Sequence, residues 1–264
     1  MSDPAKWGDL RIRIASGLIV LLLGFTAIWL GGIAVRIMAV LSAGLMIWEL
    51  ARLGAPGRPN QAVAFGAIAA GSLAPFMHLH GPYWLILLIV PSLLGLVTPR
   101  KDRIIFAVYA LLIMIACYAF VAFREGRGLG FAVWLVLVVI ASDVMGYFGG
   151  RTFGGPKFWP RVSPKKTWSG TIAGWGGAAV IGLGASAIVG NPAMTVCVSV
   201  LTAFAAQMGD IAESAIKRRS GVKDSSGLIP GHGGFLDRFD GLIGAAVFVV
   251  LWGLVRLPLP DFGG

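Results

Sequence analysis

Apolar runs long enough to cross a lipid bilayer recur along almost the whole chain. A membrane-spanning helix needs about 20 predominantly apolar residues. Hydropathy predicts nine such runs, at residues 12–30, 33–50, 61–79, 82–98, 104–123, 129–149, 170–190, 192–213 and 241–257. A helix satisfies its own backbone hydrogen bonds, as the hydrocarbon core requires. We therefore expect an all-α, polytopic integral membrane protein with nine transmembrane helices.

The composition argues against the soluble alternatives. Hydrophobic residues make up 57% of the chain and charged residues only 13%, whereas soluble domains carry about 25% charged residues. The mean hydropathy of +0.82 points the same way. The two cysteines, Cys117 and Cys197, fall inside predicted spans and lack the spacing of a zinc site. A disordered chain and a disulfide scaffold are therefore excluded, and a soluble globular enzyme is not expected.

The basic residues predict an orientation. With the N-terminus in the cytoplasm, 18 of the 22 Lys and Arg residues fall in inner segments, which is the positive-inside pattern. This pattern predicts a cytoplasmic N-terminus, an outer C-terminus and a place in the cell inner (cytoplasmic) membrane. The net charge of +10 is then topological, and we expect no nucleic-acid partner. The first apolar run exceeds the about 7–15 residues of a signal-peptide core, so we expect an uncleaved signal anchor.

Polar residues divide the chain into two regions. Residues 1–128 carry hydrophobic spans with short connections, whereas residues 129–264 carry two long inner loops rich in polar groups. We therefore expect N-terminal transmembrane helices followed by a C-terminal catalytic region. In the first region, Glu49 is expected to form a structural pair with Arg52, three residues further on.

Carboxylates stand at the inner ends of predicted spans. An ionisable group at membrane depth costs about 2.5–3.5 kcal/mol on insertion scales, so Asp143, Asp210 and Glu213 each call for a partner or a function. One helix face carries four polar residues at i, i+3, i+4 and i+7: Asp210, Glu213, Ser214 and Lys217. An intrahelical Glu213–Lys217 pair is one interpretation. A carboxylate that faces a basic loop is favoured, because that pair would leave Asp210 without a partner.

The segment from Ser214 to Asp240 combines three kinds of group. Glycines allow backbone N–H groups to approach an anion, and carboxylates suit a hard cation such as Mg²⁺. The cations are Lys217, Arg218, Lys223 and Arg238, the glycines are Gly231, Gly233 and Gly234, and the carboxylates are Asp224, Asp237 and Asp240. Together they favour a site for a metal–polyphosphate. The chain has no P-loop motif.

The other inner loop has a similar content. Ser163 and Thr167 provide hydroxyl groups beside Lys165 and Lys166. Thr167 or Ser169 can cap the helix that follows, which would leave its N-terminus to an anion. A capped helix preceded by positive-inside lysines is the alternative interpretation.

The residues from Ser214 to Asp240 resemble the signature of bacterial phosphatidate cytidylyltransferases, also called CDP-diacylglycerol synthases. With h for an apolar residue, the signature reads S-x-h-K-R-x4-K-D-x-small-x2-h-P-x-H-G-G-h-x-D-R-h-D, and all of its specified positions are met over 27 consecutive residues. Ser142-Asp143, Gly149 to Gly154 and Ser163-Pro164-x-Lys166-Thr167 also resemble this family. Ser169 stands where many members have Glu. The N-terminal half matches only in having several spans.

The resemblance implies a nucleotidyltransferase that makes CDP-diacylglycerol and pyrophosphate from CTP and phosphatidic acid, with Mg²⁺. It also implies a site at the cytoplasmic surface, open to the bilayer. The implied metal ligands are Asp210 and Asp237, with Asp240 as a further one. The implied catalytic set adds Lys217, Lys223 and Arg238, and the implied substrate-binding residues are Arg218, His232, Gly233, Gly234, Ser163, Lys166, Thr167 and Asp143. The oligomeric state stays open, a homodimer included.

Two other functions compete with this one. Asp237-Arg-Phe-Asp240-Gly241 begins like the motif of CDP-alcohol phosphotransferases, but the two further aspartates of that motif are missing. A transporter or channel could use Asp143 and Asp210 along an ion path, but it would not require the loop rich in glycine, lysine and arginine.

Overall fold

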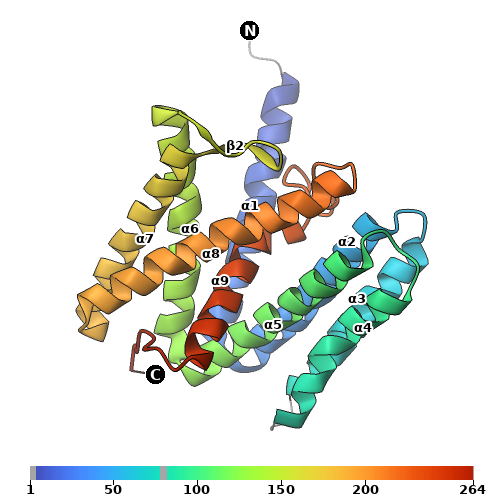
Figure 1. Cartoon of the computed structure of the whole chain (residues 1–264), viewed down its shortest axis with the longest axis horizontal. Coiled ribbons are helices and arrows are strands. Elements are labelled where there is room, and N and C mark those ends of the chain that lie inside the picture. The colour runs from blue at the N-terminus through green and yellow to red at the C-terminus, as the bar shows by residue number, and fades with distance from the viewer. Residues whose placement is uncertain (1–3, 78–81, 264) are drawn as a thin grey trace. The chain divides into compact units, whose positions relative to one another are not determined.

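The structure is a computed structural model, which describes residues 4–77 and 82–263 (Figure 1). This part of the chain is almost entirely helical. The elements are α1 (Pro4–Leu30), α2 (Gly32–Gly54), α3 (Pro59–Leu73), η1 (Ala74–Met77), η2 (Pro82–Ile89), α4 (Val90–Val97), α5 (Arg103–Gly126), α6 (Gly128–Phe153), β1 (Lys157–Trp159), β2 (Ser163–Thr167), α7 (Trp168–Val189), α8 (Pro192–Arg219) and α9 (Leu236–Leu254).

Five helices in the described residues are long and apolar enough to cross a membrane: α2, α5, α6, α7 and α8. Shorter apolar helical stretches cover Ala15–Leu30 and Leu85–Val97. The expectation of an all-α, polytopic membrane protein is therefore confirmed, whereas the number nine is not. In the predicted span 61–79, α3 ends at Leu73 and a 3₁₀ turn that contains Pro75 follows. In the predicted span 82–98, the α-helix begins only at Val90.

The described chain forms two compact units. Unit 1 consists of residues 1–114 and 220–238, and unit 2 consists of residues 115–219 and 239–264. The segment that carries most of the signature residues therefore belongs to the unit built from the N-terminal helices. The functional division at residue 128, which rests on where the polar loops lie, stays a prediction.

In unit 1, α2 and α3 pack with their backbones close together. A Cβ atom on Gly66 would lie 2.8 Å from the carbonyl oxygen of Gly44.

Between α4 and α5, the guanidinium carbon of Arg100 lies 4.1 Å from the ring centre of Phe65 and 3.8 Å from that of Phe106. Burial, with a smaller contribution from the charge of Arg58, lowers the pKa of Arg100 to about 10.

In unit 2, a buried amide joins α6, α7 and α8. The indole Nε1 of Trp175 donates to Gln207 Oε1 at 3.1 Å. Gln207 Nε2 in turn donates to Ser142 Oγ at 3.2 Å and to the carbonyl oxygen of Thr171 at 3.3 Å. The short antiparallel pair β1–β2 leads directly into α7. The three helices are therefore fixed around one hydrogen-bonded side chain that lies one turn from Asp210.

The glycines of α7 provide a matched test of this packing. A Cβ atom on Gly174 would lie 2.6 Å from Gln207 Nε2 and 2.8 Å from the carbonyl oxygen of Ser142, whereas one on Gly176 would meet nothing within 4 Å. Overpacking costs about 1–3 kcal/mol, and Ala is favoured over Gly inside a helix by about 1 kcal/mol. We expect Gly174→Ala to lose up to about 2 kcal/mol and Gly176→Ala to gain up to about 1 kcal/mol, measured by thermal unfolding in detergent. Equal unfolding temperatures for the two variants would contradict the close packing at Gly174.

Candidate active site

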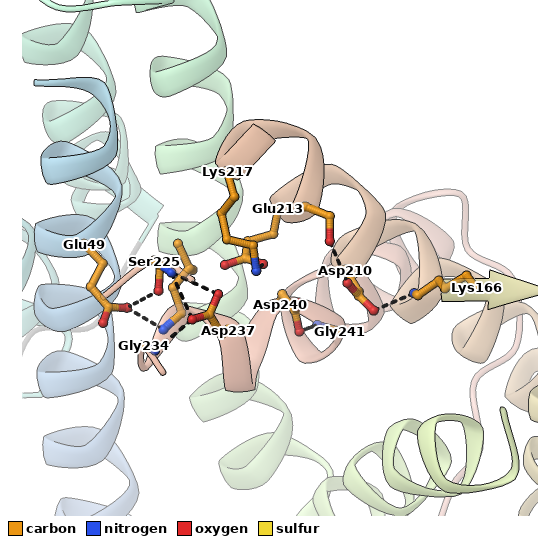
Figure 2. A network of polar contacts seen from close by, with 12 residues as sticks. Glu49, Lys166, Asp210, Glu213, Lys217, Ser225, Gly234, Asp237, Asp240 and Gly241 are labelled. Atoms are coloured by element: carbon orange, nitrogen blue, oxygen red, sulfur yellow. Dashed lines mark hydrogen bonds and ion pairs between the residues drawn. The ribbon is translucent and has the colours of Figure 1, made fainter. Parts of the chain in front are cut away.

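Glu49 of α2 is the centre of the polar contacts in unit 1. Its carboxylate accepts hydrogen bonds from the residues that connect α8 to α9, here called the 220–235 loop, and from the first residue of α9. The donors are Ser225 Oγ at 3.2 Å, Ser226 Oγ, the Phe235 N–H at 2.9 Å and the Leu236 N–H at 2.5 Å. We call this set of contacts the Glu49 clasp, of which Figure 2 labels Glu49 and Ser225.

The Glu49 clasp solves the problem of a buried charge. Glu49 has no exposed surface, and an unpaired ion there would be very costly. All four of its contacts are donors, which suits an ionised carboxylate, and hydrogen bonds to a charged group are worth about 1.5–3 kcal/mol each. The carboxylate also lies at the N-terminus of α9, where the helix dipole favours a negative charge.

The sequence interpretation of Glu49 missed this role. It expected a pair with Arg52, but the guanidinium of Arg52 lies 4.9 Å from the ring centre of Trp48. A signal was available, because Glu49 is the only acidic residue between positions 10 and 101. A single carboxylate in such an apolar stretch needs strong partners. Those partners lie more than 170 positions away in sequence, so spacing alone did not identify them.

Asp237, the second residue of α9, also binds the 220–235 loop. Its carboxylate accepts from the N–H of Gly234 at 2.7 Å and from the N–H of Ser225 at 3.0 Å. With the Glu49 clasp, this directs three successive N–H groups, those of Gly234, Phe235 and Leu236, to carboxylates. The backbone donors that a helix N-terminus leaves unpaired are thus satisfied by side chains.

The glycines of the loop serve its shape. Gly231 and Gly233 have φ angles of +77° and +88°, which favour glycine. A Cβ atom on Gly234 would overlap Ser225 Oγ and lie 2.8 Å from Glu49 Oε1. The N–H groups of His232 and Gly233 donate to the carbonyl oxygen of Ile229. In this structure the backbone of Gly233 and Gly234, predicted to bind substrate, therefore donates within the protein.

Of the other predicted site residues in or next to the loop, His232 contacts α1, whereas Lys223 and Arg238 are exposed to solvent. His232 Nδ1 lies 2.9 Å from Ser16 Oγ of α1, which also donates to the carbonyl oxygen of Pro230 at 2.9 Å. Lys223 and Arg238, which flank the clasped segment, are exposed. Exposed cations of this kind are suited to bind phosphate groups.

In unit 2, the polar face predicted on α8 is present (Figure 2). Asp210 forms an ion pair with Lys166 of β2 at 2.5 Å and accepts from Ser214 Oγ at 3.2 Å. Glu213 and Lys217 form the intrahelical ion pair that was the less favoured interpretation, and both are buried. Asp210 is nevertheless not left without a partner, because it pairs with Lys166, which is distant in sequence.

Asp240, in the first turns of α9, lies near these charges. The charges of Asp210, Lys217 and Asp143 all act on it, and its Oδ1 accepts from the N–H of Gly241 at 2.7 Å. The helices approach closely here, since a Cβ atom on Gly209 would overlap the carbonyl oxygen of Asp240. Unit 2 therefore gathers carboxylates from α6, α8 and α9, with Lys166 and Lys217 beside them.

The hairpin before α7 behaves as predicted at one position. Thr167 is the N-cap of α7, where its Oγ1 accepts from the N–H of Gly170 at 3.2 Å. Ser169 donates to the carbonyl oxygen of Gly154. Ser163 lies at the start of β2 and is half-buried. Capping thus accounts for Thr167 structurally.

The candidate carboxylates suit a magnesium ion that is held by one or two of them and by substrate. Within residues 4–77 and 82–263, no group of three or more His, Cys, Asp or Glu side chains is arranged to hold a metal ion. Mg²⁺ usually takes one or two carboxylates and completes its shell with water and substrate phosphates. Asp210 and Asp240 match that use. Asp237 is engaged by the backbone of the loop.

Comparison with known proteins gives one family. The model of the cytidylyltransferase family matches residues 11–255. Curated proteins named phosphatidate cytidylyltransferase are similar: one from Brucella abortus at 45% identity over 133 residues, one from Haemophilus influenzae at 44% over 129 and one from Mycobacterium bovis at 39% over 127. These matches cover 50%, 46% and 46% of this chain, and 49%, 45% and 40% of the relatives.

The chain thus spans about half the length of the curated relatives it matches, or less. The family model, in contrast, extends over nearly all of the 264 residues, and the protein therefore belongs to the cytidylyltransferase family.

Proposed function

We propose that the protein is a phosphatidate cytidylyltransferase, which makes CDP-diacylglycerol and pyrophosphate from CTP and phosphatidic acid for phospholipid biosynthesis. The observation that carries the proposal is the gathering of Asp210, Asp240 and Asp143 beside Lys166 and Lys217 in unit 2. Such a mixture of carboxylates and cations suits a magnesium–polyphosphate. The relatives that share the family carry this activity in their names.

The proposed reaction needs no protein nucleophile. An ionised phosphate oxygen of phosphatidate attacks the α-phosphorus of CTP, and the bond from that phosphorus to the oxygen bridging to the β-phosphate breaks. Pyrophosphate leaves with the electron pair of that bond. The protein has to hold two polyanions together and stabilise the charge that develops on the leaving group.

We assign the residues as follows. Asp210 and Asp240 would hold Mg²⁺, which when bound neutralises phosphate charge. Lys166 sets the orientation of Asp210 through their ion pair. The exposed cations Lys223, Arg238 and Arg218 bind substrate phosphates. Lys217 is paired with Glu213 and acts on the charge of Asp240. The main role of Asp237 is to hold the shape of the 220–235 loop through the N–H groups of Ser225 and Gly234.

The two substrates also set the location. Phosphatidate lies in the bilayer and CTP in the cytoplasm, so the reaction requires a polar site at the cytoplasmic face of the inner membrane. The distribution of Lys and Arg supports that orientation. It places the N-terminus in the cytoplasm and the C-terminus outside.

The activity can be tested with the full chain in detergent micelles. With CTP labelled at its α-phosphate, we expect label to enter the lipid fraction only when phosphatidate and Mg²⁺ are both present, and chelation by EDTA to abolish the transfer. Transfer from CDP-diacylglycerol to an alcohol instead would show a CDP-alcohol phosphotransferase. Absence of label in lipid with both substrates and Mg²⁺ present would refute the proposal.

The metal assignment predicts the effect of neutral substitutions. Asp210→Asn and Asp240→Asn keep the shape but remove the charge that attracts Mg²⁺. Because a metal contributes several kcal/mol to such a step, turnover should fall on the order of a hundredfold or more. Asp261→Asn, at an exposed position near the C-terminus, is the control and should behave as the wild type. A variant that keeps more than roughly a tenth of wild-type turnover would remove its residue from the metal site.

The orientation has its own test. A reporter that is active only in the cytoplasm should give a signal when fused to the N-terminus and none when fused after Gly264, because the positive-inside pattern places the two ends on opposite sides. A strong signal from the C-terminal fusion would require an even number of spans.

A further inference from the structure

We propose that Glu49 is a positioning residue for the nucleotidyl transfer, acting from outside the signature segment through the shape of the 220–235 loop. The proposal rests on the proposed function for its catalytic consequence. Its structural part, the order of the loop, depends on the Glu49 clasp alone. Every residue in the clasp lies in unit 1.

The Glu49 clasp joins the two ends of the loop. Ser225 and Ser226 lie early in it, whereas Phe235 and Leu236 lie where α9 begins. One buried side chain thus closes a segment of the chain on itself. Asp237 closes the same segment a second time, through the N–H groups of Ser225 and Gly234.

Two of the cations that the proposed reaction uses flank the closed segment. Lys223 lies two residues before Ser225, and Arg238 lies two residues after Leu236, and both are exposed. Fixing the segment at both ends therefore fixes the backbone from which these two side chains extend. Catalysis gains from such preorganisation because phosphate-binding groups need no rearrangement when substrate arrives.

The position requires a carboxylate rather than any polar side chain. Hydroxyl groups of two serines and two backbone N–H groups all donate to Glu49. A glutamine of the same size has one acceptor and one amide donor, and its NH₂ group would face donors. Gly234 leaves the space that the clasp needs, since a side chain there would overlap Ser225 Oγ.

The test uses Glu49→Gln in the full chain in detergent, with Glu125→Gln, an exposed glutamate of α5, as the matched control. Hydrogen–deuterium exchange reports the protection of the Phe235 and Leu236 amides. In Glu49→Gln we expect faster exchange confined to peptides of the 220–235 loop and the start of α9. We also expect kcat/KM for CTP to fall by roughly tenfold, the effect of one lost charge-assisted hydrogen bond. Glu125→Gln should change neither.

Kinetic and stability measurements separate positioning from general support of the fold. For positioning, KM for CTP should rise, and the faster exchange should stay confined to the 220–235 loop and the start of α9 while the rest of α2 exchanges as in the wild type. Ser226→Ala removes one donor only and should change exchange and KM in the same direction by a smaller factor. If Glu49→Gln fails to insert in the membrane, the Ser226→Ala variant tests the positioning role of the Glu49 clasp in its place.

Each outcome bears on the proposal. Wild-type exchange and wild-type kinetics in Glu49→Gln, or in Ser226→Ala where the first variant does not insert, would overturn it. Faster exchange throughout the protein would also overturn it, since Glu49 would then support the whole fold. A wild-type protein without CTP-dependent activity would instead refute the proposed function, and the exchange measurement would still report whether the clasp orders the loop.

Discussion

A single buried carboxylate organises the polar part of unit 1. Glu49 is the only acidic residue of α2 and has no exposed surface, so its charge is tolerable only where donors surround it. Two serine hydroxyls and two backbone N–H groups provide them. The dependence is mutual, because the same contacts join the two ends of the 220–235 loop.

In unit 2, several carboxylates come together near the start of α9. Asp210 is matched by Lys166 and Glu213 by Lys217, and Asp240 lies close enough to both Asp210 and Asp143 for mutual repulsion. A cation that carries two charges would relieve that repulsion. The helices keep this arrangement through close backbone contacts at Gly209 and Gly244 and through the amide of Gln207.

The sequence predicted the features that depend on local spacing. Apolar runs predicted the helical class, and the position of Thr167 predicted the cap of α7. The i, i+4 spacing allowed the Glu213–Lys217 pair that the structure contains, but a carboxylate facing a basic loop was favoured over it. The effect of proline was harder to predict from the sequence. The apolar run that contains Pro75 was expected to span the membrane, but in the structure it is a short helix followed by a 3₁₀ turn. The partners of Glu49 and Asp210 were not found, because they lie far away in sequence. The glycines near position 233 were assigned to anion binding because composition does not say which acceptor takes a given N–H group.

The membership of residues 220–238 in unit 1 has a consequence for dividing or recombining this protein. A fragment that starts at residue 129 would contain the whole signature and would lack the carboxylate that shapes its loop. A chimera that joins this C-terminal region to the first helices of another protein would need an acidic residue at the position of Glu49, together with the space beside it that Gly234 leaves. In the design of such hybrids, the second helix and the 220–235 loop form one transferable module, although Glu49 and Ser225 lie 176 positions apart in the chain.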